Sequence, residues 1–224
     1  MARSQPSWVA ASARPGDSSP TWGARAPRSC SRPAKLPWCH DRIVTGISHL
    51  LIRTERTGDE AGIRAVHLAA FAHDGQQGTA EANLVDALRA AAAFPPELSV
   101  VAEADGRIIG HLLISHASIE TASGAVPCLA LAPLAVLPGY EHLHTGTKLM
   151  RHALARAARS GHRLMVVLGH PKYYRRFGFR PAPPRGITCR WPVPPEAFMV
   201  LELVPGALDG VRGIARYHTA FDDL

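Results

Sequence analysis

The sequence predicts an α/β domain with a central mixed, mostly antiparallel sheet flanked by helices. A two-residue turn signal, Asp105-Gly106, joins two apolar segments and is typical of a β-hairpin. A long apolar run at 128–137 indicates a strand covered on both faces. An amphipathic segment at 145–160 follows this run, as expected for an α/β arrangement. The 224 residues suffice for one such domain with a tail.

The elements expected before the long apolar run follow from hydrophobic periodicity and helix boundary signals. They are a strand at 50–54, helices at 60–71 and 79–92, and strands at 99–104 and 107–116. Asp59 stands where a helix N-cap is expected, and Pro95-Pro96 stops the second helix. The two strands that flank Asp105-Gly106 are expected to pair antiparallel.

The elements expected from the long apolar run onward complete the domain. They are strands at 128–137, 164–168 and 198–204, a helix at 145–160 and a short helix at 173–177. Pro133 cannot donate to a strand ladder, so we expect a bulge or a local loss of pairing there. Gly161 is placed to end the long helix. No strand is expected after the one at 198–204.

Residues 1–45 lack the periodicity of a folded element and are rich in Ser, Pro, Arg, Ala and Gly. Such a segment cannot bury enough apolar surface to offset its ordering entropy. We expect a disordered extension, or upstream sequence that the true start codon would exclude. An Arg- and Ser-rich organelle transit peptide is the alternative. The folded domain is expected to span 46–224.

The charge distribution argues against a nucleic-acid-binding body. The formal net charge is +7, but residues 1–48 carry +5 and the remainder only +2. Nucleic-acid binding would therefore depend on the basic tail, and we regard it as the weakest functional alternative. No apolar run approaches the roughly 20 residues that span a bilayer, which excludes a membrane-spanning protein.

The cysteines and histidines do not group into a metal site or a disulfide framework. The four cysteines are scattered, at Cys30, Cys39, Cys128 and Cys189. This usage fits a reducing compartment, so we expect a cytoplasmic protein. The histidine pairs His67/His73 and His142/His144 lack the spacing of zinc ligands, so we expect no metal.

Four segments carry a resemblance to a known family. They are LAPLAVLPGY at 131–140, YYRRFGF at 173–179, GHP at 169–171 and PPEAFM at 194–199. The first two, with the helix after 144, resemble the GCN5-related N-acetyltransferases (GNAT). The last two are similar to a bacterial subgroup of predicted N-acetyltransferases. The likeness runs from about Leu50 to the C-terminus and implies the acyl-CoA N-acyltransferase fold, with acetyl-CoA as donor and a small-molecule or peptide amine as acceptor.

The resemblance also implies where acetyl-CoA would bind. In the family the central strand parts from its neighbour, and the pantetheine arm bonds to the freed backbone. Here that backbone belongs to Leu134, Ala135 and Val136. The pyrophosphate would lie on a turn and helix start formed by His142, Leu143, His144, Thr145, Gly146 and Thr147. The Val136 N–H, or a near neighbour, would stabilise the oxyanion.

The proton donor to the CoA sulfur is implied by position. Tyr174 lies four residues before Gly178, where the family places that acid, and adjacent Tyr173 ranks second. The general base is not identified by any motif. The candidates on or near predicted strands are Glu103, His111, His116 and Glu120, each with an ordinary structural role as the simpler interpretation. The cluster of Lys172, Arg175, Arg176 and Arg180 would steer an anionic cofactor or simply form a solvated face.

One segment departs from the family pattern. The turn is Gln or Arg, two residues, Gly, one residue, then Gly or Ala in the family; here it is Glu141 to Gly146, and only Gly146 agrees. His144 adds a Cβ where backbone must approach phosphate, and Glu141 adds a negative charge. A protonated His142 or His144 would offset that charge. The alternative function is therefore a catalytically degenerate domain that binds CoA or a protein partner without turnover. The oligomeric state stays open, with a homodimer as one option.

Overall fold

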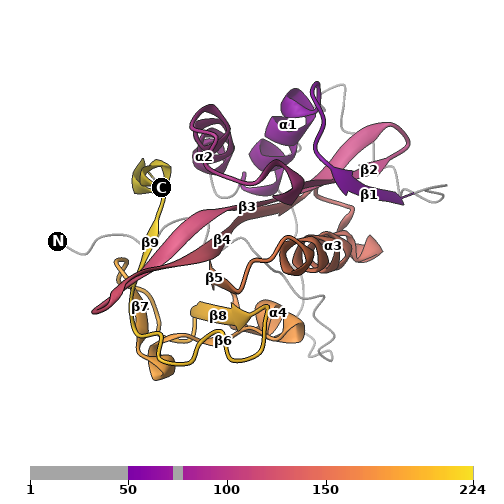
Figure 1. Ribbon diagram of the computed structural model, residues 1–224. Coiled ribbons are helices and arrows are strands. Elements are labelled where there is room, and N and C mark those ends of the chain that lie inside the picture. Colours follow the sequence, from indigo (N-terminus) through magenta and orange to yellow (C-terminus); the bar gives the residue numbers. More distant parts are fainter. Residues whose placement is uncertain (1–49, 73–77, 224) are drawn as a thin grey trace, which may run out of the picture.

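The computed structural model describes residues 50–72 and 78–223 (Figure 1). The predictions made for the tail at 1–45, for the start of the domain at 46–49 and for His73 lie outside the described residues. Within them the chain folds around a single nine-stranded sheet with helices on both faces. The mixed, mostly antiparallel α/β architecture predicted from the sequence is confirmed.

The sheet follows the order β1-β2-β3-β4-β5-β8-β6, and β9 pairs with both β3 and β7. The strands are β1 Leu50–Thr54, β2 Ser99–Ala104, β3 Arg107–Thr121, β4 Gly124–Val136, β5 Leu164–Leu168, β6 Arg180–Pro181, β7 Ile187–Cys189, β8 Phe198–Glu202 and β9 Gly213–Tyr217. The β4–β5 and β7–β9 pairs are parallel, and the other pairs are antiparallel. The long apolar run therefore lies in the middle of the sheet, as predicted.

The helices divide between the two faces of the sheet. Helices α1 Glu60–Ala70 and α2 Thr79–Ala90 cover one face, and α3 Thr145–Arg159 and α4 Pro171–Tyr174 cover the other (Figure 1). Two successive residues of β3 mark the division. A Cβ on Gly110 would meet side chains of α3, whereas His111 bonds to His67 of α1. Each long helix buries one apolar stripe against the sheet, which is the reason for its position.

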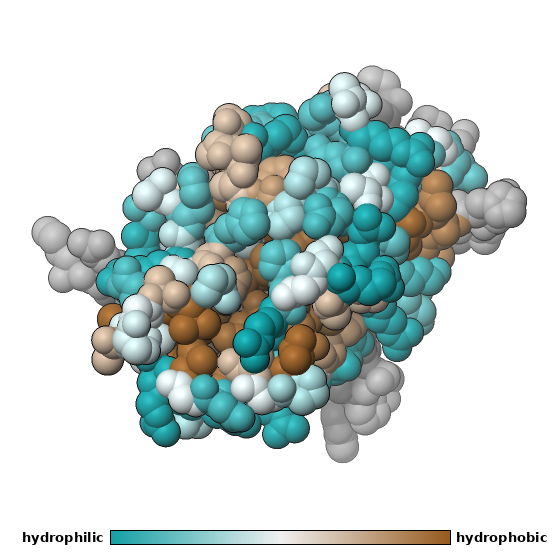
Figure 2. All heavy atoms as spheres, in the orientation of Figure 1, coloured by the Kyte–Doolittle hydropathy of each residue, from teal (hydrophilic) through white to brown (hydrophobic). Residues whose placement is uncertain are grey.

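The space-filling view shows apolar surface below the β3–β4 ribbon and, separately, at the edge near β1, while the outer sides of α1 and α3 are mostly polar (Figure 2). The buried residues Ile119, Val166 and Phe198 belong to a second core cluster, which includes residues of β5 and β8. The main cluster lies between the sheet and the long helices. The β3–β4 hairpin contributes residues to both clusters and so connects them.

The hairpin is longer than the sequence predicted. Pairing continues past His116 to Thr121 opposite Gly124, and the far half of β3 is covered by β9. The strand β9 was missed, and the prediction that the strand at 198–204 is the last one is wrong. β9 is short, with one fully buried residue, Ala215, so it offers little hydrophobic alternation to detect.

The irregularity expected at Pro133 is a bulge. Leu112 pairs with Leu134 and Ile114 with Leu131, so Ala132 and Pro133 together oppose Leu113. The Ala132–Pro133 peptide is cis. Beyond the bulge β4 resumes a regular register with β3, which places residues 134–136 at the end of the strand.

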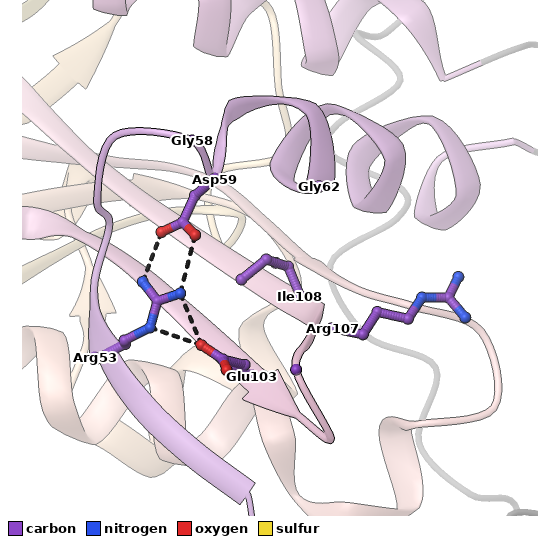
Figure 3. A pocket seen from close by; sticks show the side chains of 8 residues that line it. Arg53, Gly58, Asp59, Gly62, Glu103, Arg107 and Ile108 are labelled. Atoms are coloured by element: carbon purple, nitrogen blue, oxygen red, sulfur yellow. Dashed lines mark hydrogen bonds and ion pairs between the residues drawn. The ribbon is translucent and has the colours of Figure 1, made fainter.

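Asp59 occupies the N-cap position of α1 but makes no side-chain cap, contrary to the expectation. Its carboxylate accepts hydrogen bonds from both terminal nitrogens of Arg53, at 2.6 and 2.9 Å, and this contact lowers the pKa of Asp59. Arg53 also pairs with Glu103 at 2.7 Å (Figure 3). These three residues, whose charges are paired with one another, line an open hollow of about 360 Å³ together with Arg107 and Ile108.

Candidate functional site

The two central parallel strands part in the middle of the sheet. β4 pairs with β5 over Leu129–Leu131 only, opposite Met165–Val167. Beyond that point β4 stays paired with β3 as far as Val136, while β5 stays paired with β8 as far as Leu168. Within the described residues, the β5 side of β4 therefore carries no strand at residues 134–136.

The peptide groups at this parting point into the gap. The N–H of Leu137 donates to the Ile109 carbonyl of β3 at 2.8 Å. Because successive peptide groups of a strand point to opposite sides, the N–H and C=O of Val136 face the opening, as do those of Leu134. The side chains of Leu134 and Ala135 are buried, at 8% and 2% exposure. A ligand with its own amides could bind here as an added strand.

The first turn of α3 lies on one face of this parting. The helical ladder begins with the Lys148 N–H, which donates to the His144 carbonyl at 3.0 Å. The N–H groups of Thr145, Gly146 and Thr147 therefore have no acceptor within the helix. A 15-residue helix with an open first turn favours a negative charge at that end.

The turn that departs from the family pattern folds as a short 3-10 turn, Glu141–Leu143, before α3. The Glu141 carboxylate accepts the Gly139 N–H at 2.8 Å, so its hydrogen bonding is directed to the preceding turn. His142 and His144 are exposed. His144 adopts a left-handed backbone with φ of +56°, a conformation that favours glycine.

The two tyrosines of α4 occupy different positions. The Tyr174 side chain is 2% exposed and packs edge-on against Tyr173 and Phe179, with ring centroids 5.1 and 5.8 Å away. The Tyr173 hydroxyl reaches α3: a Cβ built on Gly146 would lie 2.8 Å from it and 3.7 Å from Cγ2 of Val136. The structure thus brings the hydroxyl of Tyr173 to the junction of β4 and α3.

The Tyr173 hydroxyl is buried and has no hydrogen-bond partner among the described residues. Burial raises the pKa of Tyr173 to about 12, although the guanidinium of Arg176 lies 4.7 Å from its ring centroid. The phenol therefore stays protonated at any physiological pH. The sequence ranks Tyr173 second to Tyr174 as the proton donor. Which of the two adjacent tyrosines turns toward α3 depends on packing and could not be predicted.

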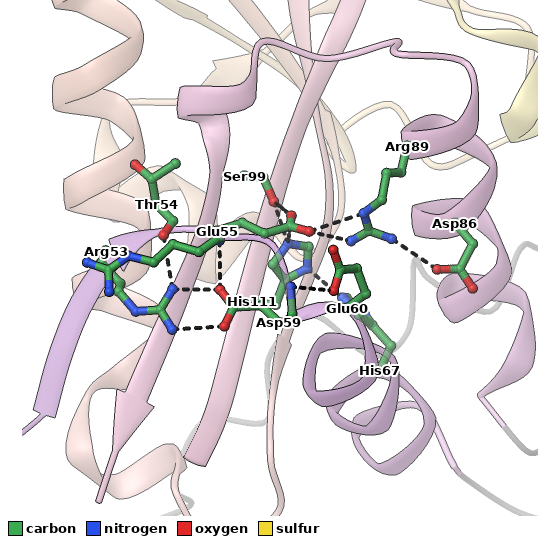
Figure 4. Close-up of polar contacts among 12 residues, drawn as sticks. Arg53, Thr54, Glu55, Asp59, Glu60, His67, Asp86, Arg89, Ser99 and His111 are labelled. Atoms are coloured by element: carbon green, nitrogen blue, oxygen red, sulfur yellow. Dashed lines mark hydrogen bonds and ion pairs between the residues drawn. The ribbon is translucent and has the colours of Figure 1, made fainter. Parts of the chain in front are cut away.

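The four candidate bases are all engaged or distant from the parting. Glu103 pairs with Arg53 at 2.7 Å, and Glu120 pairs with Arg216 at 2.7 Å. His116 is exposed and lies beyond the β3 residues that face the parting. His111 alone has a register partner there, Ala135, but it is fully buried and hydrogen-bonded to His67 and Ser99 (Figure 4).

Among residues 50–72 and 78–223 no group of three or more His, Cys, Asp or Glu side chains could hold a metal ion. In the same ranges no helix is long and apolar enough to cross a membrane.

A mixed sheet whose central parallel strands part, with an open helix start beside the parting, defines the class of acyl-CoA N-acyltransferase folds. The model of the acetyltransferase (GNAT) domain matches residues 51–182. The chain therefore belongs to the GNAT acetyltransferase family, as its motifs predicted, and that family is one of acyltransferases.

Curated relatives agree with this assignment. YhbS of Escherichia coli (strain K12), described as an uncharacterized N-acetyltransferase, is 34% identical over 173 residues, which cover 77% of this chain and 99% of YhbS. YjhQ of the same strain, described in the same words, is 32% identical over 151 residues, covering 67% of this chain and 81% of YjhQ. The chain spans most of the length of both relatives.

Solved structures of similar proteins contain the expected ligand. The GNAT family N-acetyltransferase YhbS from Escherichia coli, in complex with CoA, superposes with a TM-score of 0.69 at 34% identity and covers 77% of this chain and 92% of that chain. A GNAT family acetyltransferase from Brucella melitensis, in complex with acetyl-CoA, gives a TM-score of 0.62 at 38% identity, covering 78% and 99%. The predicted fold is confirmed.

Proposed function

We propose that this protein transfers the acetyl group of acetyl-CoA directly to the amine of a small molecule or peptide. The observation that carries the proposal is the parting of β4 from β5, with the peptide groups of Leu134 and Val136 turned into the gap beside the first turn of α3. Both similar structures described above hold CoA or acetyl-CoA, which supports the same ligand here.

The pantetheine arm would lie along Leu134, Ala135 and Val136 as an added strand. The pyrophosphate would be held at the start of α3, by the backbone of His142, Leu143, His144, Thr145, Gly146 and Thr147. The residues present fit this ligand: the first-turn N–H groups lack helical acceptors, and Glu141 is bonded to Gly139. The Tyr173 hydroxyl, which remains protonated, is placed to donate to the same ligand.

Acyl transfer needs three contributions from the protein: stabilisation of the oxyanion, a proton for the sulfur and removal of the amine proton. The Val136 N–H, which faces the parting, would stabilise the oxyanion that develops on the thioester carbonyl. Tyr174 would give its proton to the departing CoA sulfur. An ordinary phenol has a pKa of about 10 and an ordinary thiol one of about 8.5, so this transfer is only slightly uphill. The third contribution, removal of the amine proton, requires a general base.

The alternative is a degenerate domain that binds CoA or a protein partner without turnover. The single feature that favours it is the turn before α3, where His144 stands in a left-handed conformation at a position that the family fills with glycine. Its exposed side chain and the Cβ beneath it lie next to the proposed phosphate site.

Two measurements on the full chain separate these functions. Titration calorimetry with acetyl-CoA tests binding, and release of free thiol from acetyl-CoA in the presence of a panel of primary amines tests turnover. Binding with amine-dependent thiol release supports the acetyltransferase. Binding without release by any amine supports the degenerate domain, and absence of binding at millimolar acetyl-CoA rejects both ligand assignments.

A further inference from the structure

A continuous chain of hydrogen bonds runs under α1 and α2 (Figure 4). Nε2 of His67 lies 2.8 Å from Nδ1 of His111, and Nε2 of His111 lies 2.9 Å from the Ser99 hydroxyl. The Ser99 hydroxyl bonds to Oε2 of Glu55, whose other carboxylate oxygen accepts from Arg89 at 2.7 and 3.1 Å. The four residues from His67 to Glu55 thus form one hydrogen-bond chain, and they come from α1, β3, β2 and the connection after β1.

The protons in this chain have one arrangement. The Glu55 carboxylate, paired with Arg89, can only accept, so the single proton of the Ser99 hydroxyl points to it. Ser99 must then accept from Nε2–H of His111. A neutral His111 has a bare Nδ1, which accepts Nε2–H of His67. Every donor therefore points toward Glu55, and Nδ1 of His67 is left unprotonated.

Burial, together with nearby positive charge, keeps the two imidazoles neutral. Burial and the nearby Arg89 of α2 lower the pKa of His67 to about 3, and burial, His67 and Arg89 hold the pKa of His111 well below its usual value. A carboxylate oxygen of Glu55 lies 3.9 Å from Nε2 of His111. The ring of His67 is also fixed by stacking on Phe71, at 5.9 Å and 5°.

Nδ1 of His67 is a buried acceptor that has no partner among residues 50–72 and 78–223. The residue is 0% exposed, and among the described residues no donor reaches this atom. The other polar side-chain atoms of this hydrogen-bond chain, from Nε2 of His67 to Glu55, are all paired. The unpaired Nδ1 is therefore a specific feature of its His67 end. A bare, oriented imidazole nitrogen can accept a proton or an N–H hydrogen bond.

The His67 end of the hydrogen-bond chain lies on the sheet face opposite α3. His111 is the register partner of Ala135, and paired residues of antiparallel strands put their side chains on the same face. Gly110 and Val136, one position along, face α3. With the phosphates held at α3, an acceptor amine reaches the thioester from the other face, which is the face of His67 and His111.

We propose that Nδ1 of His67 accepts, through one water molecule, the proton that the acceptor amine loses when it attacks the thioester, and that His111, Ser99 and Glu55 position it for this task. The proposal rests on the proposed acetyltransferase function. The C–N bond forms, and the amine proton passes to His67. Nε2–H moves to His111, the His111 proton moves to Ser99 and the Ser99 proton to Glu55. Glu55, with a side chain 12% exposed, releases it to solvent. The C–S bond breaks, the sulfur takes its proton from Tyr174, and solvent returns a proton to Tyr174, so the proton released through Glu55 balances the one taken up.

The variant His67→Gln separates proton acceptance from structure. A glutamine amide can keep the donor to Nδ1 of His111 but has no group equivalent to the bare Nδ1. His162→Gln is the matched control, because His162 is half-buried and lies outside the chain. Ser99→Ala interrupts the chain between His111 and Glu55 and leaves Nδ1 in place.

The test uses the full chain with acetyl-CoA and two probe amines of similar size, ethylamine and the much less basic 2,2,2-trifluoroethylamine, beside the best amine of the panel. We expect His67→Gln to lower kcat about 100-fold for basic amines, the size of a general-base effect. The loss should be much smaller for the fluorinated amine, which gives up its proton unaided. Acetyl-CoA affinity should not change, Ser99→Ala should lose about tenfold, and His162→Gln should match the wild type.

A second measurement does not depend on turnover. In ¹⁵N-histidine-labelled protein at pH 7, we expect His67 and His111 both to carry their proton on Nε2. A proton on Nδ1 of His67 overturns the proposal. So does equal loss for both probe amines, or full activity of His67→Gln. If wild type binds acetyl-CoA but acetylates no amine, the proposed function fails and takes the proposal with it.

Discussion

The two faces of the sheet treat their polar groups in opposite ways. On the α3 face, the first-turn N–H groups of α3 and the Tyr173 hydroxyl lack partners among the described residues, as do the peptide groups of Leu134 and Val136 in the adjoining gap between β4 and β5. On the face under α1 and α2, polar side chains pair with one another from Glu55 to His67. The face with unpaired donors can bind an anionic ligand. On the other face, the hydrogen-bond chain from His67 to Glu55 fixes where each proton lies. Nδ1 of His67, which has no partner among residues 50–72 and 78–223, departs from the second pattern.

The largest expected effect concerns the pH dependence of stability on the α1 and α2 face. His67 and His111 have pKa values well below the unfolded value of about 6.5, so the unfolded state binds more protons below pH 6.5. Stability is therefore full above pH 6.5 and falls as the pH is lowered toward the folded pKa values. Between pH 7 and pH 5 the titration of His67 should cost about 2 kcal/mol, and that of His111 should add to the loss in the same direction. Urea unfolding at the two pH values measures this loss.

His67→Gln provides the comparison for this effect, since glutamine does not titrate. We expect the variant to lose about 2 kcal/mol less than wild type over the same interval. An identical loss in both proteins would mean that His67 is protonated in the folded state.

The next effect separates the two tyrosines on the α3 face. We expect Tyr174→Phe to lower turnover about 100-fold with little change in acetyl-CoA affinity, because it removes the proposed proton donor. Tyr173→Phe should instead weaken acetyl-CoA binding about tenfold, the worth of a hydrogen bond to a charged group. Steady-state kinetics and calorimetry on both variants measure the split. The opposite split would assign the proton donor to Tyr173.

A smaller effect tests the approach of α3 to Tyr173. In Gly146→Ala the new Cβ would lie 2.8 Å from the Tyr173 hydroxyl, closer than such contacts occur. We expect acetyl-CoA affinity to fall about tenfold and the protein to lose about 1–2 kcal/mol of stability. The double variant with Tyr173→Phe relieves the clash and should regain most of that stability. Equal stability of the single and double variants would contradict the contact.

The smallest effect concerns the turn before α3. His144 has a φ of +56°, so His144→Gly removes a strained side chain and should stabilise the fold by at most about 1 kcal/mol. Acetyl-CoA affinity should rise a few-fold because the Cβ beside the phosphate site is removed. Thermal unfolding and calorimetry measure both changes. Weaker binding in this variant would show that the His144 imidazole contacts the ligand.

Much of the fold could be predicted from local signals. The apolar run of β4, the hairpin turn at Asp105-Gly106 and the bulge at Pro133 each have a physical signature in the sequence. β9 could not be found, because its burial depends on β3 and β7, which flank it only in three dimensions. The short β6 and β7 were missed for the same reason.

The candidate site divides in the same way. Residues 134–136 and 142–147 lie in one continuous segment with a family motif, so they could be proposed from the sequence. The chain from His67 to Glu55 could not, because His67 and His111 are 44 positions apart and their contact depends on how α1 crosses the sheet. Which of two adjacent tyrosines reaches Gly146 is likewise a matter of packing.

The pairing of β9 has a consequence for the parting itself. Only three register pairs join β4 to β5, so backbone bonding between the two halves of the sheet is weak at its centre. β9 adds a second connection, because it pairs with the far end of β3 and with β7. We expect this connection to limit how far the two halves of the sheet can separate. Substitutions in Gly213–Tyr217 should therefore change acetyl-CoA affinity, although these residues lie almost eighty positions after residues 134–136 in the sequence.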